Sequence, residues 1–134
     1  EEYHLENVCF AYGGKYGNEK DEFWNAANVF VFPTFYHNEC FPLVLLEAMQ
    51  HHLPCISTTE GGIPGIIDDG ETGFLVDKHD FYALADKLEF LYLHPDVRKD
   101  MGEKGYRKFQ NEFTLRKFEE RMVEILEHCV GKNG

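Results

Sequence analysis

The sequence predicts an α/β fold in which a parallel sheet is covered by helices on both faces and is followed by a helical C-terminal region. Two observations lead to this fold class. Short apolar runs alternate with helical segments up to about residue 78, a pattern typical of parallel strands that are buried on both faces. From residue 80 onward, apolar residues recur at helical spacing. The 134 residues fit a single domain, with a sheet core over residues 1–78 and C-terminal helices over residues 80–130.

The first elements are a strand, a loop and a short helix. Residues 7–12 form an apolar run that Gly13 and Gly14 end, which predicts a short buried strand. A polar, glycine-bearing stretch over residues 15–21 is expected to be a loop, and residues 22–27 are expected to form a short helix.

Strands and helices then alternate through the rest of the sheet core. The continuous apolar run at residues 29–32 predicts a strand that Pro33 ends. The elements expected after it are a loop over residues 34–41, a helix from about 42 to 52, a strand over 53–58, a glycine turn over 61–64, a helical turn at 66–67 and a last strand over 73–76.

Three helices are expected to form the C-terminal region. Asp80 can cap the first helix, and Pro95 both ends that helix and suits the start of the next. Thr114 can cap the last one. The apolar face of this last helix consists of Leu115, Phe118, Met122, Ile125, Leu126 and Cys129.

The helix that follows Pro42 carries the most informative side chains. On a projection at about 100° per residue, apolar side chains surround most of this helix. Only Glu47 and Gln50 lie on a narrow polar stripe, with Leu43 between them. A carboxylate in such surroundings is costly to bury without a polar partner. The stripe therefore indicates either a ligand contact or a core helix whose Glu47 reaches solvent past its edge.

The start of the same helix has the features of an anion site. Proline is favoured at the first helical position, so the N–H groups of Leu43 and Val44 are expected to have no partner inside the helix. Free amides at the positive end of a helix dipole suit a phosphate or a pyrophosphate. Glu39 lies just outside this end, so the segment offers an anion cradle between two acceptors for sugar hydroxyls.

Gly61 and Gly62 are a second candidate for a phosphate contact. They follow the strand over residues 53–58 at its C-terminal end, where open α/β sheets bind ligands. Most glycine pairs are only turns, so both interpretations stay open here. The nearby histidines at 37, 51 and 52 have no spacing that calls for a metal site.

The charge of the chain argues against two classes of partner. The formal net charge of −11 argues against nucleic acid or an anionic membrane surface as a direct partner. Residues 1–95 hold four cations against 16 acids, while nine of the 13 Lys and Arg residues lie at or after Arg98. Either the ligand of the first half is not anionic, or its cations come from elsewhere.

The four cysteines show no CxxC pair and no zinc-type spacing, and three of them lie in apolar stretches of the sequence. We interpret them as buried free thiols of a reducing compartment. Cys40 has no histidine placed to activate it as a nucleophile. No apolar run is long enough to span a bilayer, and no secretory signal is visible at the start. The chain begins with Glu rather than Met, which suggests that it was cut from something longer.

Several sequence blocks together point to a known family. They are residues 29–34 (VFVFPT), 38–49 (NECFPLVLLEAM), 53–58 (LPCIST), 61–64 (GGIP) and 70–76 (GETGFLV). In this order and spacing they resemble the donor-site signature of family-four retaining glycosyltransferases, also called glycosyl transferases group 1. The resemblance implies part of a Rossmann-like lobe of a GT-B fold, the lobe that binds a nucleotide-diphosphate sugar linked to UDP or GDP.

The resemblance also implies a role for each residue of the donor site. Glu39, with the backbone of Cys40 and Phe41, would hold the hydroxyls of the donor sugar. Glu47 would bind the ribose hydroxyls. The amides that would meet the pyrophosphate belong to Leu43, Val44, Gly61 and Gly62. Such enzymes use no metal and no other cofactor, so catalysis would rest on positioning the donor and stabilising the departing phosphate.

Departures from the family pattern limit what this chain can do. Cys40 and Gly65 stand where the family usually has Gly and an acid. The Arg and Lys that neutralise the leaving phosphate would lie upstream of residue 1, as would the first strands of the lobe and the acceptor domain. We therefore expect a chain without catalytic residues of its own, inactive alone, with an exposed sheet edge available for self-association.

Two other classes of function remain open at this stage. The chain can be a non-catalytic module that binds a nucleotide sugar or a phosphate, or a scaffold whose acidic face and helical tail bind a protein. The leading expectation is transfer to a glycan or lipid-linked acceptor, for example in polysaccharide biosynthesis. A cytoplasmic location is expected, with contact to the inner face of the membrane as an open alternative for the full-length protein.

Overall fold

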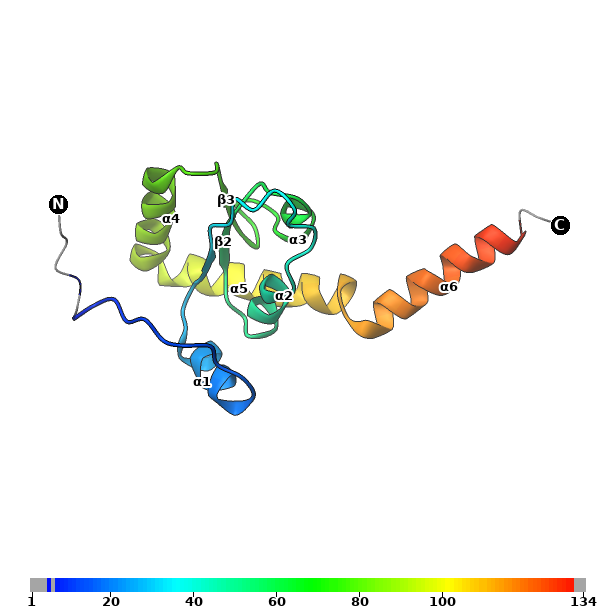
Figure 1. Cartoon of the computed structure of the whole chain (residues 1–134), viewed down its shortest axis with the longest axis horizontal. Helices are drawn as coiled ribbons and strands as arrows, with labels where there is room; N and C mark the ends of the chain where they lie inside the picture. Colours follow the sequence, from blue (N-terminus) through cyan, green and yellow to red (C-terminus); the bar gives the residue numbers. More distant parts are fainter. Residues whose placement is uncertain (1–4, 6, 132–134) are drawn as a thin grey trace.

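The structure, a computed structural model, describes residue 5 and residues 7–131 (Figure 1). Its elements are, in chain order, α1 (Asn18–Ala26), β1 (Phe30–Phe32), α2 (Leu43–Gln50), β2 (Cys55–Thr58), α3 (Ile63–Ile66), β3 (Gly73–Val76), α4 (Phe81–Leu93), α5 (Pro95–Glu112) and α6 (Leu115–Gly131).

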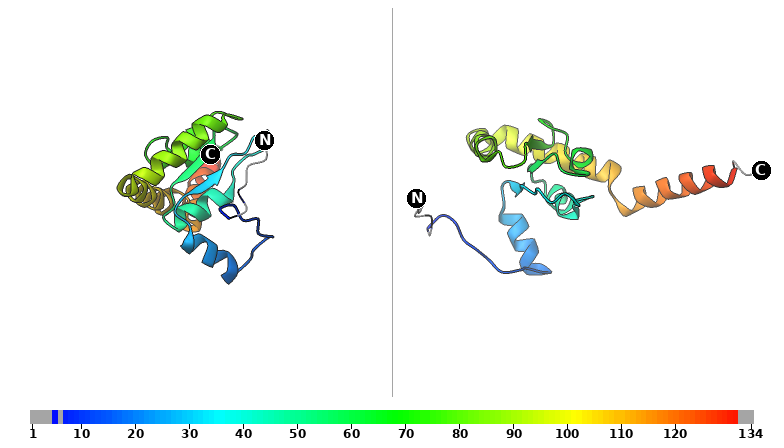
Figure 2. Two further views of the ribbon diagram at one scale, coloured as in Figure 1. Left: turned by 90° about the vertical axis from the view of Figure 1, so that its left-hand side faces the viewer. Right: turned by 45° about the horizontal axis from the view of Figure 1, so that its top comes forward.

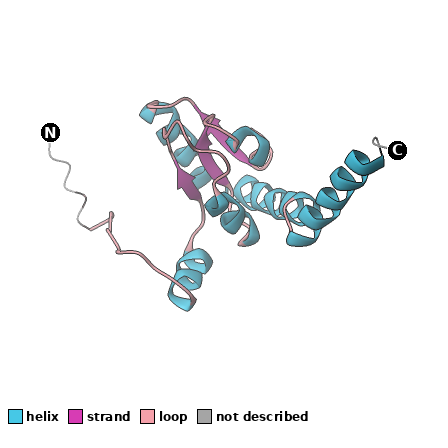
Figure 3. Ribbon diagram, turned by 45° about the vertical axis from the view of Figure 1, so that its right-hand side comes forward, coloured by secondary structure: helices cyan, strands magenta, loops and turns pink. Residues whose placement is uncertain are grey.

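The three strands form one parallel sheet in the order β1-β2-β3. Successive side chains of β2 point to opposite faces. Cys55 joins a core with residues of α2 and α3, whereas Ile56 packs with Leu91 of α4 and Met101 of α5. Helices thus cover both faces of the sheet (Figure 3), which confirms the predicted α/β class with a parallel sheet.

The boundaries of α4 and α5 agree with the sequence signals. Asp80 caps α4, because its Oδ1 accepts a hydrogen bond of 2.9 Å from the N–H of Ala83. The helix ends at Leu93, and α5 begins at Pro95. Both predicted boundaries are confirmed, since a capping side chain and a proline act locally.

The last helix, α6, projects beyond the body of the molecule (Figures 1 and 2). Thr114 stands before it, and its Oγ1 accepts a hydrogen bond of 3.3 Å from the N–H of Lys117. The predicted apolar face is present, yet no residue of α6 is buried. Exposed on this helix are Leu115, Phe118, Met122, Val123, Ile125, Leu126 and Val130.

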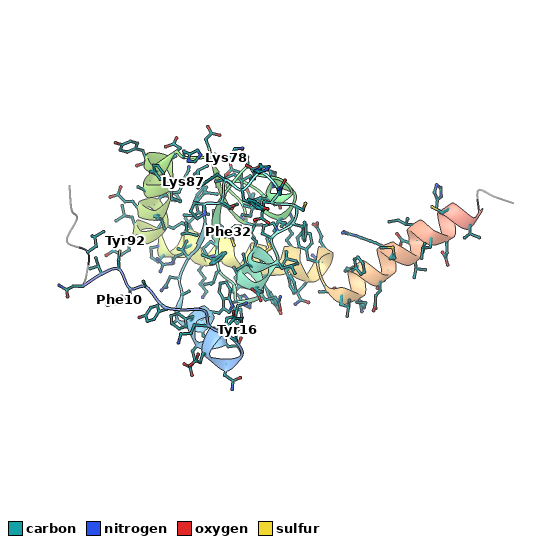
Figure 4. All side chains as sticks on the ribbon, in the orientation of Figure 1. Phe10, Tyr16, Phe32, Lys78, Lys87 and Tyr92 are labelled. Atoms are coloured by element: carbon teal, nitrogen blue, oxygen red, sulfur yellow. The ribbon has the colours of Figure 1, made fainter. Side chains whose placement is uncertain are left out.

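The predicted strand over residues 7–12 is wrong. These residues form no strand, and Val8, Phe10 and Tyr12 are each more than 60% exposed. The segment lies away from the sheet, where Figure 4 labels Phe10. A strand needs a hydrogen-bonding neighbour, and within the described residues no strand pairs with the outer edge of β1.

The loop expected over residues 15–21 is also partly wrong, because α1 already begins at Asn18 rather than at residue 22. The helix is longer than expected and includes Lys20. Its anchor is Trp24, which is 9% exposed and packs edge-on against Phe30 at 5.0 Å between ring centroids. Burial of this one side chain places α1 against the start of the sheet.

The expectation of buried cysteines holds only for Cys55. Burial raises the pKa of its thiol to about 12, so this side chain is a non-reactive part of the core. Cys9, Cys40 and Cys129 are exposed free thiols. Among the described residues, no helix combines the length and the apolar character needed to cross a membrane.

Candidate functional site

Helix α2 presents the polar stripe that the sequence predicts. Leu45, Leu46, Ala48 and Met49 are buried. The side chain of Glu47 is 39% exposed, and Leu43 and Gln50 are exposed on the same side. The polar stripe is therefore present and partly exposed, which fits both a ligand contact and a Glu47 that only reaches solvent.

The N-terminus of α2 follows Pro42, which is buried and adopts an extended backbone. No side chain caps this end of the helix within the described residues. The N–H groups of Leu43 and Val44 have no acceptor inside the helix, as in the first turn of every α-helix. The helix dipole favours a negative charge at this end.

Gly61 and Gly62 pack directly against the loop that precedes α2. The N–H of Gly62 donates a hydrogen bond of 2.8 Å to the carbonyl oxygen of Cys40. Gly61 has a φ of +52°, and a Cβ there would overlap the carbonyl oxygen of Glu39. The structure thus brings the two predicted segments together. The pyrophosphate contact expected from the Gly62 amide does not fit, because this N–H already has an acceptor.

The residues of the loop itself are partly exposed. Glu39 is half-buried, Cys40 is exposed, and Phe41 is 44% exposed. The ring of Phe41 lies edge-on to that of Phe113 at 5.8 Å between centroids, which ties the loop to the end of α5. The Glu39 N–H donates to the carbonyl oxygen of Tyr36 at 2.9 Å. A turn therefore holds the backbone of Glu39, a residue that is half-buried.

Sequence reasoning missed two lysines that lie beside carboxylates of this region. Lys20 of α1 has its Nζ 2.6 Å from Oε1 of Glu47. Lys78, labelled in Figure 4, has its Nζ 2.7 Å from Oε2 of Glu60, as an ion pair outside ideal hydrogen-bond geometry. Glu60 directly precedes Gly61. Of the four cations in residues 1–95, Lys20 contacts a predicted site residue, and Lys78 pairs with the residue next to Gly61.

An open apolar groove adjoins the start of α2. Its volume is about 590 Å³, and it runs between Phe41 and Leu43 on one side and Phe113 and Phe118 on the other. The lining is mostly apolar, with Glu112, Thr114 and Arg121 as its polar members. Within the described residues, no group of three or more His, Cys, Asp or Glu side chains could hold a metal ion.

Known proteins that are similar to this chain include glycosyltransferases. The sequence profile described as "Glycosyl transferases group 1" matches residues 1–108. A similar curated protein is the capsular polysaccharide biosynthesis glycosyltransferase CapM of Staphylococcus aureus, 39% identical over 100 residues. That alignment covers 75% of this chain and 26% of CapM. The chain thus spans about a quarter of the length of that relative.

Solved structures share the fold. Sucrose-phosphate synthase of Thermosynechococcus elongatus is 30% identical, with a TM-score of 0.73 over 82% of this chain and 27% of that protein. Anabaena HepE in complex with UDP-glucose is 18% identical, with a TM-score of 0.72 over 80% of this chain and 29% of that protein. The HepE likeness establishes the fold alone.

Proposed function

Because the chain belongs to the glycosyl transferases group 1 family, we propose that it is the nucleotide-sugar-binding part of a retaining, metal-independent glycosyltransferase. Its GT-B neighbours make this chain part of a Rossmann-like lobe of that fold. The whole enzyme would transfer a sugar from a nucleotide-diphosphate sugar to a glycan or lipid-linked acceptor. The observation that carries the proposal is the continuous segment from Glu39 to Glu47, against which Gly61 and Gly62 pack.

Each part of this segment suits one part of the donor. The carboxylate of Glu39 can accept hydrogen bonds from sugar hydroxyls, and Glu47 can accept them from ribose. Between them, the amides of Leu43 and Val44 can donate to the pyrophosphate. The two amide contacts would stabilise the negative charge that develops on the leaving phosphate. This stabilisation needs fixed hydrogen-bond donors rather than a proton-transfer residue.

Nucleotide binding tests the proposal directly. We expect UDP or GDP to change the fluorescence of Trp24, the single tryptophan. Its ring centroid lies 5.9 Å from the ammonium of Lys20, which pairs with Glu47 at the proposed ribose site. Glu47→Ala should weaken binding of that nucleotide by about 10- to 100-fold, since a hydrogen bond to a charged group contributes about 1.5–3 kcal/mol. Glu39→Ala should weaken binding of the nucleotide sugar but leave the nucleotide itself little affected.

The matched control is Glu71→Ala. Glu71 also accepts from a lysine, Lys104, at 2.8 Å, but it precedes β3 and so lies at the amino ends of the strands. Its removal should change nucleotide affinity less than twofold. No saturable binding of UDP or GDP by the unchanged chain would refute the proposal.

The exposed apolar face of α6 favours one alternative, a scaffold that binds a protein partner. A third possibility is a module that binds the nucleotide sugar without transferring it. Nucleotide binding that depends on Glu47 would favour a glycosyltransferase part or a binding module over a protein scaffold. Sugar transfer by a longer protein that includes upstream sequence would then favour the glycosyltransferase over the non-transferring module.

We also propose that this chain alone does not transfer sugar. The family resemblance implies that the phosphate-neutralising cations and the acceptor domain would lie upstream of residue 1, and that the outer edge of β1 would pair with upstream strands. Incubation with UDP-glucose should therefore yield neither transfer nor hydrolysis. At rising concentration the chain should self-associate through β1 in sedimentation experiments. Measurable turnover would contradict the first expectation, and a strictly monomeric chain the second.

A further inference from the structure

Lys20 occupies a position between the two helices of the candidate site. Its ammonium lies 2.6 Å from Oε1 of Glu47 and 5.9 Å from the ring centroid of Trp24. The side chain is therefore held from two sides, by a carboxylate and by the face of an indole. The side chains of Lys20 and Glu47 are 36% and 39% exposed, so the ion pair lies at the surface, beside the buried Trp24.

The packing of α1 explains why this lysine reaches Glu47. Lys20 and Trp24 are four residues apart, so they lie on the same face of the helix. Trp24 is buried against Phe30 and stacks on His51 at 5.7 Å, and His51 Nδ1 lies 3.3 Å from Oδ1 of Asn25. These contacts turn the face that carries Lys20 toward α2.

The contact leaves part of the carboxylate free. A carboxylate has two oxygens and about four acceptor positions. Lys20 uses Oε1, and no hydrogen bond to Oε2 is found among the described residues. Without Lys20 the Glu47 side chain could rotate, and a ligand would have to immobilise it on binding. A carboxylate that is already oriented avoids this entropic cost.

We propose that Lys20 is a positioning residue that holds the Glu47 carboxylate ready for the ribose hydroxyls of a nucleoside diphosphate. The proposal rests on the proposed donor site and adds a specific role to it. Lys20 supports discrimination for a nucleotide that carries the 2′-hydroxyl. A lysine that only fastened α1 to α2 would affect stability without affecting this discrimination.

The test compares UDP with 2′-deoxy-UDP by calorimetry, or GDP with 2′-deoxy-GDP if the chain prefers guanine. We expect the unchanged chain to bind the ribonucleotide about tenfold more tightly than its deoxy form, a ratio set by hydrogen bonds to a charged acceptor. Lys20→Met should bring this ratio close to one and weaken ribonucleotide binding. Lys20→Arg, which keeps the charge, should restore most of the ratio.

Lys15→Met is the matched control, because Lys15 forms an ion pair with Glu19 at 3.5 Å near the start of α1 and has no contact with Glu47. The ratio of ribonucleotide to deoxyribonucleotide affinity in Lys15→Met should equal that of the unchanged chain. In a Glu47→Ala background, Lys20→Met should cause no further loss, because the two residues act through one contact.

Three outcomes would overturn the inference. If Lys20→Met keeps the ratio of the Lys15→Met control, Lys20 does not position Glu47, although the donor site stands. If the Lys20 and Glu47 variants lose affinity additively, Lys20 acts on the ligand independently. If the unchanged chain binds neither UDP nor GDP, the proposed function fails and this inference with it. Circular dichroism identifies a misfolded variant, for which Lys20→Gln then replaces Lys20→Met.

Discussion

Replacement of Gly102 by alanine is expected to lower the free energy of unfolding by about 3 kcal/mol, in the upper range for overpacking of a core. Gly102 is buried in α5, where the helix lies against the connection between α2 and β2. A Cβ there would overlap the carbonyl oxygen of His52 and lie 2.9 Å from its carbonyl carbon. These are backbone atoms, so they cannot turn aside as a flexible side chain would.

Gly105 provides the control within the same helix. It is also buried, yet a Cβ there would meet its nearest neighbour, Cγ of Met49, at 3.6 Å, an ordinary contact. Because alanine is favoured over glycine inside a helix by about 1 kcal/mol, Gly105→Ala should leave stability unchanged or raise it. Urea denaturation followed by circular dichroism measures both variants. Equal losses of unfolding free energy in the two variants would show that overlap with the His52 carbonyl is not what destabilises Gly102→Ala.

The fold could be predicted wherever the decisive signal is local. The limits of α4 and α5 follow from Asp80 and Pro95, whose effects on the backbone do not depend on distant residues. The strand expected over residues 7–12 failed for the opposite reason. Its apolar composition is compatible with a strand, but a strand also requires a neighbour, and composition carries no information about which neighbours are present.

The candidate site shows the same division. The polar stripe of Glu47 could be predicted because it depends only on helical periodicity. Lys20 could not, since its position depends on the burial of Trp24 against β1, a tertiary contact. The sequence also offered Gly61 and Gly62 as phosphate contacts, whereas the structure shows that their lack of a side chain allows two loops to touch. A glycine pair in sequence does not reveal which close approach it permits.

That close approach leads to the second large effect, at Gly61. An alanine there would adopt a left-handed backbone, with φ of +52°, and its Cβ would overlap the Glu39 carbonyl oxygen. We expect a loss of stability of about 2–4 kcal/mol from strain and overlap together. The Glu39 backbone must move to relieve the overlap, so nucleotide-sugar binding should weaken at temperatures where the variant is still folded.

Gly65→Ala is the comparison that separates conformation from simple loss of a glycine. Gly65 lies in α3, four residues after Gly61, with no positive φ and no atom within 4 Å of an added Cβ. This variant should match the unchanged chain in thermal stability and in affinity for UDP-glucose. If Gly61→Ala bound UDP-glucose as tightly as Gly65→Ala does, contact between the Glu39 loop and the glycine turn would not shape the sugar site. Weaker binding by Gly61→Ala alone would mean that the turn acts through the position of Glu39 and not through its own amides.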